Sequence, residues 1–190
     1  RNPVNATRVI AEFREHSYAL EACHSWMCMA DCSARAKFQL ALVMQYSSMK
    51  NWSQLPLDMT ASLRSTLWTL IQNAMKDSTM PVFALNKIVQ VYALLWKRGW
   101  LELTTEQQRG LLGQLGNLFD TTINSSSNQY CLAGLKLIIS LVEEFESRST
   151  SEIGLPLEFH VKTHTAFEQQ GLNECFKMAQ VCLDGATEKL

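Results

Sequence analysis

Apolar side chains recur at steps of three and four residues along almost the whole chain, which is the spacing of one face of an α-helix. No segment shows the alternation of apolar and polar residues that is typical of a half-buried strand. We therefore predict an all-α protein. The expected helices cover residues 4–16, 18–30, 34–49, 57–75, 81–98, 104–119, 129–146 and 157–183.

The most apolar segment runs from Pro81 to Leu101, and its apolar residues lie on most sides of the expected helix. A helix of this kind is buried between neighbours and does not lie on a surface. Its last turn carries Lys97 and Arg98, where cations meet the negative end of the helix dipole. Gly99 follows as the expected residue after the helix, and the next two residues are placed to fold back on its end.

Polar residues at the expected helix starts predict specific caps. Ser33 is placed to cap the helix over residues 34–49, and Asp58 is placed to cap the next one. Thr105 is the expected cap of the helix after the central segment, with Gln108 at the capping-box position. Loops are expected at residues 124–128 and 147–156, where Ser, Thr, Asn and Gly gather.

The expected helices form pairs that repeat along the chain. The apolar helices centred near residues 42, 90 and 138 recur at about 48 residues, close to the period of HEAT-type repeats. A unit that cannot bury its own apolar face must stack on a neighbour, so we predict an α-solenoid of HEAT-type helical hairpins. Residues 1–190 form one repeat segment, with pairs at 18–50, 57–98 and 104–146, an unpaired second helix at 4–16 and an unpaired first helix at 157–184.

Composition disfavours two broad classes of function. Charged residues are only 18% of the 190 residues and the net charge is −1, so no basic field favours nucleic acid as the main partner. No apolar run is long enough to span a membrane, and no signal peptide is visible. Because the chain starts at Arg1 without a Met, we expect a fragment of a longer protein. The six cysteines lie mostly in apolar helical settings, which favours reduced, buried thiols in a cytosolic or nuclear protein.

Two groups of residues are spaced in a way that metal ligands can be. His24, Cys28 and Cys32 lie four residues apart, so all three could share one helix face. Zinc sites usually place their cysteine pairs on turns with shorter spacing, so core cysteines are the favoured interpretation. His160 and His164 form a second four-residue pair, but no Glu stands beside the first His, and we expect exposed or capping histidines.

The sequence contains no motif that we can assign to catalysis. Gly110, Gly113 and Gly116 recur at every third residue, but no strand precedes them and the G-x-G-x-x-G pattern is absent. Close packing of the helix against a neighbour is the expected role of these glycines. We therefore predict a protein that is not an enzyme and that needs no cofactor and no metal.

Polar residues also interrupt the apolar second helices of the pairs. If these helices line the concave side of a solenoid, their polar residues form one continuous ridge that a protein partner could contact. The alternative is the solvated stripe that every such array carries, and for any single residue that alternative is favoured. The candidate contact residues are Gln39, Gln45, Tyr46, Asn86, Lys87, Gln90 and Lys136.

Several motifs together resemble the N-terminal HEAT repeats of the importin-β superfamily of nuclear transport receptors. They are Phe38-Gln-Leu-Ala-Leu, Lys50-Asn-Trp, Ser62-Leu-Arg-Ser-Thr-Leu, Trp96-Lys-Arg-Gly-Trp-Leu and Glu152-Ile-Gly-Leu-Pro-Leu-Glu-Phe-His. Within the superfamily they are most similar to exportin-4-like receptors, with exportin-7-like receptors as the nearest competitor. The resemblance extends from about Val4 to Leu183, and Gln45-Tyr46 stands where many members have Lys-Asn.

The resemblance implies a receptor that binds the small GTPase Ran in its GTP form through the inner helices of these repeats. Such a receptor shuttles between nucleus and cytoplasm, carries protein cargo past nucleoporins and has no catalytic residues of its own. The implied cargo is of the translation-factor or transcription-factor type. The polar residues of the second helices would then face Ran, and Lys97 and Arg98 could add favourable charge or simply cap their own helix.

Two other functions stay open at this point. One is a HEAT-repeat scaffold that binds another protein without any dependence on Ran or its nucleotide. The other is an enzyme with a metal at His24, Cys28 and Cys32. The sequence alone does not separate cargo import from cargo export.

Overall fold

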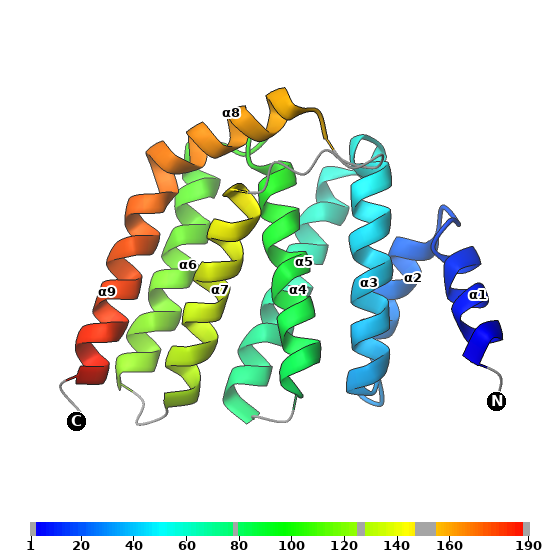
Figure 1. Cartoon of the computed structure of the whole chain (residues 1–190), viewed down its shortest axis with the longest axis horizontal. Helices are drawn as coiled ribbons and strands as arrows, with labels where there is room; N and C mark the ends of the chain where they lie inside the picture. Colours follow the sequence, from blue (N-terminus) through cyan, green and yellow to red (C-terminus); the bar gives the residue numbers. More distant parts are fainter. Residues whose placement is uncertain (1–2, 78–79, 125–127, 147–154, 188–190) are drawn as a thin grey trace. The chain divides into compact units, whose positions relative to one another are not determined.

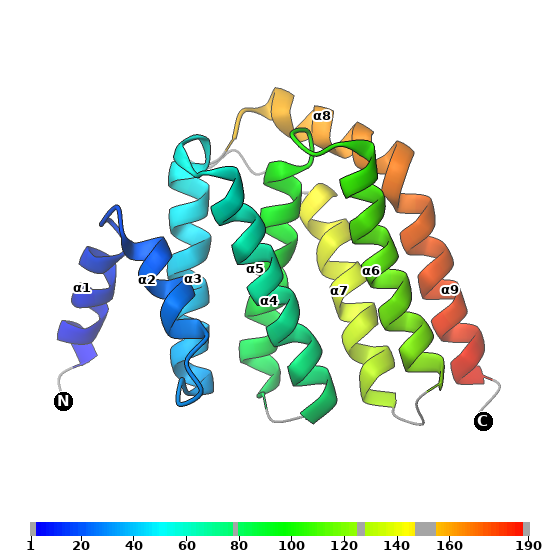
Figure 2. The ribbon, with the colours of Figure 1, turned by 180° about the vertical axis from the view of Figure 1, so that it is seen from behind.

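The computed structural model describes residues 3–77, 80–124, 128–146 and 155–187, and every regular element in these ranges is a helix. The prediction of an all-α protein is confirmed for this part of the chain, which is shown from two opposite sides in Figures 1 and 2. Two compact units make up the chain, one over Arg1–Leu95 and the other over Trp96–Leu190. The central helix contributes residues to both units.

Unit 1 is built around a closely packed pair of helices, α2 and α3, followed by two long helices. Trp68 of one long helix stacks on Tyr92 of the other, with ring centroids 5.7 Å apart. The inward faces carry Leu, Ile and Met at helical spacing, as the apolar pattern predicts. The elements are α1 (Pro3–Phe13), α2 (Ala19–Met27), α3 (Ala34–Asn51), the short 3₁₀ helix Trp52–Gln54, α4 (Leu57–Asp77) and most of α5 (Val82–Gly99).

Unit 2 has an aromatic centre. Trp100, Phe145 and Phe167 form it, with ring centroids 5.3 Å, 5.5 Å and 4.0 Å apart. Helices α6 and α7 lie side by side, α8 crosses one end of this pair, and α9 runs back along both (Figures 1 and 2). The elements are the end of α5, α6 (Thr105–Asn124), α7 (Asn128–Glu146), α8 (Leu157–Phe167) and α9 (Asn173–Thr187).

The last predicted helix, over 157–183, is not continuous. A π-helical segment, Glu168–Leu172, separates α8 from α9 and changes the direction of the chain (Figure 1). Gly171 is buried within this segment, where the ring of Phe167 occupies the space of a side chain. The interruption therefore lets Phe167 reach the aromatic centre while α9 turns back along α6.

Two of the predicted caps can be checked at the start of α3 and α4. Ser33 caps α3 as predicted, since its Oγ accepts a hydrogen bond from the backbone N–H of Ala36 at 3.2 Å. Asp58 is not the cap of α4, because that helix already begins at Leu57. The Asp58 carboxylate lies in the first turn and accepts from the backbone N–H of Met59 at 2.9 Å, where its charge still suits the helix dipole.

The predicted capping box of α6 is displaced by one residue. Thr104, and not Thr105, is the cap: its Oγ1 accepts from the Gln107 backbone N–H at 3.3 Å. In the reciprocal hydrogen bond of this capping box, the Gln107 Oε1 accepts from the Thr104 backbone N–H at 2.9 Å. Gln108 is instead buried, and its Nε2 donates to the Trp100 carbonyl at 2.8 Å. The repeated Thr and Gln allow both registers, and the burial of Gln108 selects this one.

The expected burial of the central helix is confirmed, and it extends further than the sequence indicates. All residues from Val91 to Trp100 are buried, including the two cations Lys97 and Arg98. Gly99 is the last residue of α5 and not the one after it. Trp100 folds back into the core as expected, whereas Leu101 is 43% exposed.

The expected close packing at two of the α6 glycines is wrong. A Cβ on Gly110 or Gly113 would meet no heavy atom within 4 Å in the described structure, and one on Gly116 would meet only Met178 Cε at 4.0 Å. At Gly171, in contrast, a Cβ would lie 2.7 Å from a ring carbon of Phe167. The two kinds of glycine therefore have opposite roles.

We expect alanine to have opposite effects at Gly113 and Gly171. Gly113→Ala should raise the free energy of unfolding by about 0.5–1 kcal/mol, because alanine favours an exposed helix interior. Gly171→Ala should lower it by about 1–3 kcal/mol, because the Phe167 ring must move out of the aromatic centre. Urea denaturation followed by circular dichroism measures both, and shifts of the same sign would contradict the assignment.

Candidate functional site: two grooves beside helix α1

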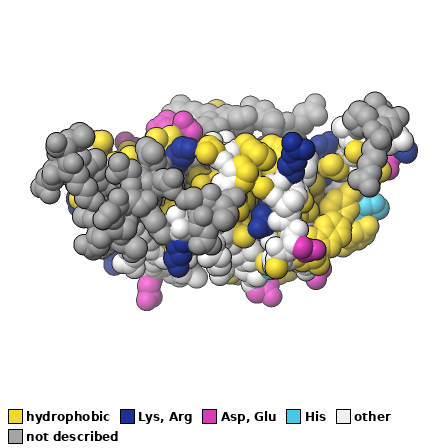
Figure 3. All heavy atoms as spheres, turned by 90° about the horizontal axis from the view of Figure 1, so that it is seen from below, with side chains coloured by type: hydrophobic (Ala, Val, Ile, Leu, Met, Phe, Trp, Pro, Cys, Tyr) yellow, Lys and Arg dark blue, Asp and Glu magenta, His cyan; other side chains and the backbone are white. Residues whose placement is uncertain are grey.

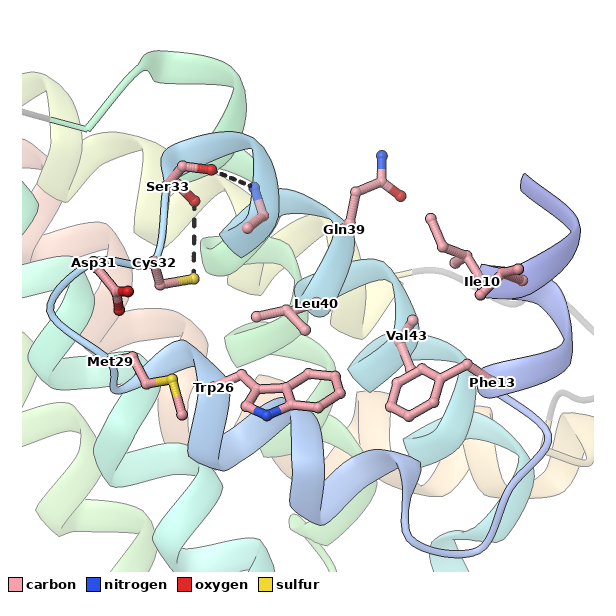
Figure 4. Close-up of a pocket in the computed structure, with 12 residues that line it drawn as sticks. Ile10, Phe13, Trp26, Met29, Asp31, Cys32, Ser33, Gln39, Leu40 and Val43 are labelled. Carbon is pink, nitrogen blue, oxygen red and sulfur yellow. Dashed lines mark hydrogen bonds between the residues drawn. The ribbon is translucent and has the colours of Figure 1, made fainter. Parts of the chain in front are cut away.

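The first groove, which we call the apolar groove, lies between α1, the α2–α3 turn and α3 and has a volume of about 610 Å³. The ring of Phe13 stacks on that of Trp26, with centroids 5.5 Å apart, and both rings face into it (Figure 4). Trp26 is 44% exposed, so this aromatic pair is open to solvent. The lining residues are Val9, Ile10, Phe13, Trp26, Met29, Asp31, Cys32, Ser33, Ala36, Gln39, Leu40 and Val43.

The chemistry of the apolar groove is that of a binding surface. Leu40 and Val43 of α3 point toward the aromatic pair, whereas Gln39 points away from it (Figure 4). Hydrophobic side chains also gather on the surface at the α1–α2 end of unit 1 (Figure 3). Such a surface can bury an apolar side chain, but its lining brings no nucleophile and base together.

The second groove, which we call the arginine groove, lies on another side of α1 and has a volume of about 540 Å³. Its floor includes Phe38 of α3 and Phe83 of α5, whose rings meet edge to face at 5.6 Å. The charged side chains among its described lining residues are Arg14 and Arg35. Ile10 and Gln39 line both grooves. The remaining lining residues are Ala6, Thr7 and Ala11.

A polar cluster beside the arginine groove fixes the position of Arg14. The Tyr46 hydroxyl donates to Glu15 Oε1 at 2.6 Å, and Lys50 Nζ donates to the other carboxylate oxygen. The Arg14 guanidinium lies over the Tyr46 ring, 4.2 Å from its centroid. The bonds from Lys50 and then Tyr46 hold the pKa of Glu15 below its usual value. The Tyr46 side chain, predicted to face a partner, is thus already engaged inside unit 1.

The other predicted contact residues of unit 1 lie in different surroundings. Gln39 is exposed, whereas Gln45 is half-buried and lies about 120° away from it around α3. Asn86 and Gln90 are exposed on α5, and Lys87 between them donates to Gln90 Oε1 at 3.4 Å. The helical spacing of the last three residues places them on one face of α5.

Lys136, the remaining candidate, is exposed on α7 in unit 2. A ridge that continues from α3 through α5 to α7 stays a prediction. Within unit 1, the structure brings together Gln39, Phe83 and the start of α5, since Gln39 and Phe83 line the same groove.

Lys97, considered as a possible surface contact, is only 2% exposed. Its Nζ donates to the backbone carbonyl of Glu144 at 2.6 Å and lies 3.9 Å from the Glu144 carboxylate. His160, expected to be exposed or capping, is also buried, and its Nε2 donates to the carbonyl of Leu155 at 3.1 Å. Burial and then the nearby charge of Lys97 lower the pKa of His160, with a smaller contribution from Arg98. Lys97 in the last turn of α5 therefore contacts α7.

The two possible metal-ligand groups do not assemble in the described structure. His24 Nε2 lies 2.7 Å from Thr66 Oγ1 and 3.4 Å from Ser62 Oγ, so this side chain joins α2 to α4. His164 lies 3.5 Å from a Glu146 oxygen and 3.8 Å from a Glu168 oxygen. Among the described residues, no three His, Cys, Asp or Glu side chains are grouped in a way that could hold a metal ion.

The described cysteines fall into two environments. Burial raises the pKa of Cys23 to about 12, and burial together with Glu174 raises that of Cys175 to about 11. Cys28 is exposed and Cys32 is half-buried, contrary to the expectation that the cysteines are core residues. The side chains of the other two cysteines, at 131 and 182, lie outside the described residues.

No family model and no solved structure matches the chain. Among the described helices, none is both long enough and apolar enough to cross a membrane. Sequence reasoning missed both grooves, because they depend on how α1 packs against α3. One available signal was Arg35, a cation in the first turn of a helix whose first turn contains no acidic residue.

Proposed function

We propose that the chain is a segment of a Ran-GTP-dependent nuclear transport receptor of the importin-β superfamily, of the exportin-4-like type. In this proposal the helices are HEAT-type hairpins stacked as an α-solenoid. The observation that carries it is the proximity of buried residues from two motifs of the resemblance in unit 2. Lys97 and Arg98 of the Lys-Arg-Gly-Trp motif lie close enough to His160 of the Glu-Phe-His motif to lower its pKa. Buried residues of two motifs that are distant in sequence thus lie near one another in unit 2, which supports a shared fold.

Such a receptor acts by binding, and the hydrolysis of GTP belongs to Ran. The γ-phosphate orders the switch loops of a GTPase, so a surface that contacts these loops distinguishes the GTP form from the GDP form. The exposed amides of Asn86 and Gln90, with Lys87 between them, can donate and accept hydrogen bonds on such a surface. The proposed partners also include nucleoporins and a protein cargo, and the receptor shuttles between nucleus and cytoplasm.

Charge reversal on this face of α5 tests the proposal. We expect Lys87→Glu with Gln90→Glu to weaken binding to Ran loaded with a non-hydrolysable GTP analogue by about tenfold or more, since one attraction becomes a repulsion. Binding of the 190-residue chain to immobilised Ran, measured by biolayer interferometry, gives the affinities, with GDP-loaded Ran as reference.

The matched control is Asn73→Glu with Lys76→Glu. These two residues are exposed on α4 with the same three-residue spacing, and their replacement changes the charge by the same amount. Equal losses in both double variants would indicate a non-specific charge effect. An unchanged affinity of the Lys87 and Gln90 variant for GTP-loaded Ran would show that this face of α5 does not contact Ran.

A scaffold that binds proteins without Ran is the second candidate. The Phe13–Trp26 pair of the apolar groove, in which Trp26 is exposed and Phe13 half-buried, favours it. Such a surface can hold an apolar anchor of a partner whichever nucleotide Ran carries. Equal binding of a protein partner in the presence of GTP-loaded Ran, in the presence of GDP-loaded Ran and without Ran would support this candidate over the first.

A further inference from the structure

The arginine groove combines an apolar floor with an excess of positive charge. Its described charged lining consists of Arg14 and Arg35. Arg14 Nε lies 3.6 Å from Glu15, but the same carboxylate also accepts from Lys50. The single negative charge of Glu15 is therefore shared between Arg14 and Lys50. The rim of the groove consequently carries a net positive charge.

The position of Arg35 adds a second element to this charge. It is the second residue of α3, where the exposed N–H groups already give the helix end a partial positive charge. The first turn of this fully described helix contains no acidic residue that would offset the cation. A locally unfavourable charge of this kind is typical of positions that serve binding and not stability.

The floor of the groove suits an apolar anchor. Phe83 is 48% exposed although its ring packs on Phe38, so one side of this aromatic pair is open. Stacking on Tyr46 restricts the Arg14 guanidinium, which lowers the entropy cost of binding an anion. Guanidinium groups pair with carboxylates through two parallel hydrogen bonds.

We propose that the arginine groove binds an acidic segment of a protein partner. An aromatic or aliphatic side chain of the segment packs on Phe38 and Phe83, and flanking carboxylates pair with Arg14 and Arg35. This docking requires neither Ran nor nucleotide, so it stands whether or not the chain is a transport receptor. It differs from the apolar groove, whose described lining contains the acidic Asp31 and no arginine.

Fluorescein-labelled peptides provide the test, measured by fluorescence anisotropy with the 190-residue chain. The first peptide carries a Leu-Phe pair between glutamates, the second the same pair between lysines, and the third a Ser-Ser pair between glutamates. We expect the first peptide to bind at least about tenfold more tightly than either of the others, and its affinity to fall as salt rises. Equal binding of all peptides, or no binding of the first at millimolar chain, would overturn the proposal.

Matched variants locate the peptide. We expect Arg14→Gln with Arg35→Gln to weaken binding of the first peptide by about tenfold or more. The control is Arg8→Gln with Lys76→Gln, which removes the same charge from two exposed positions outside the groove lining. An equal loss of peptide affinity in both double variants would show that net charge alone attracts the peptide. That result would contradict specific binding in the arginine groove.

The apolar contact has its own control. Phe83→Ala should weaken binding of the first peptide by several-fold. Phe176→Ala, which truncates a 68% exposed Phe on α9, should leave the affinity for this peptide unchanged. Circular dichroism of each variant checks that the helices are intact. A folded Phe83→Ala chain that binds as tightly as the unaltered chain would contradict the assigned floor.

Discussion

Replacing Trp100 with alanine should lower the free energy of unfolding by about 3–5 kcal/mol, one of the two largest effects we expect in this chain. Trp100 is fully buried, and its ring packs edge to face against Phe145 at 5.3 Å and Phe167 at 5.5 Å. Its removal leaves a cavity beside Phe145 of α7 and Phe167 of α8. Because the free energy of unfolding of a domain is only about 5–15 kcal/mol, this substitution removes a large part of the stability of unit 2.

Trp26→Ala is the matched control for this experiment. Trp26 stacks on Phe13 but is 44% exposed, so its loss removes one aromatic contact and leaves no closed cavity. We expect a decrease of only about 1 kcal/mol. Urea denaturation followed by far-ultraviolet circular dichroism gives both values, and equal decreases would contradict the central role of the aromatic cluster in unit 2.

The helices are largely predictable because their information is local. Leu63, Leu67 and Ile71 repeat at four-residue steps, and all three are fully buried on the inward face of α4. Caps are less well determined, since Thr104 and Thr105 both offer a hydroxyl and only the burial of Gln108 selects the register. The break between α8 and α9 was not predictable, because it follows from the place of Phe167 in the aromatic centre.

The candidate site depends on contacts between residues that are distant in the chain. Arg14 follows the end of α1 and Tyr46 lies on α3, and no local pattern indicates that the guanidinium lies over the tyrosine ring. The α6 glycines show the same limit. Their spacing suggested a packing face, but a Cβ at Gly110 or Gly113 would meet no heavy atom within 4 Å among the described residues. Sequence periodicity predicts which side of a helix is apolar, but not which partner lies against it.

The burial of Lys97 shows most clearly what the local pattern could not predict. A lysine in the last turn of a helix usually extends into solvent and interacts with its own helix end. Here its ammonium group instead donates to the carbonyl of Glu144, which lies 47 residues further along the chain. Lys97 therefore satisfies a backbone group near the end of α7 and joins that helix to the end of α5.

Lys97→Ala should lower the free energy of unfolding by about 2–4 kcal/mol. The substitution removes a charge-assisted hydrogen bond to Glu144 and also the buried methylene stem. Lys97→Met keeps most of the buried volume and should cost less than half as much, because the Glu144 side chain is 27% exposed and can be solvated. Lys136→Met, at an exposed lysine of α7, should change the stability by less than about 0.5 kcal/mol.

A second readout separates the charge of Lys97 from its packing. Burial and the charge of Lys97 both hold the pKa of His160 below its ordinary value of 6.5, so Lys97→Met should raise this pKa part of the way back. In the unaltered chain, the unfolded state takes up the His160 proton first as the pH falls below about 6.5, so stability declines there. The decline should be smaller in Lys97→Met. Titration of the His160 ring by nuclear magnetic resonance measures the shift, and an unchanged pKa would show that the Lys97 charge does not act on His160.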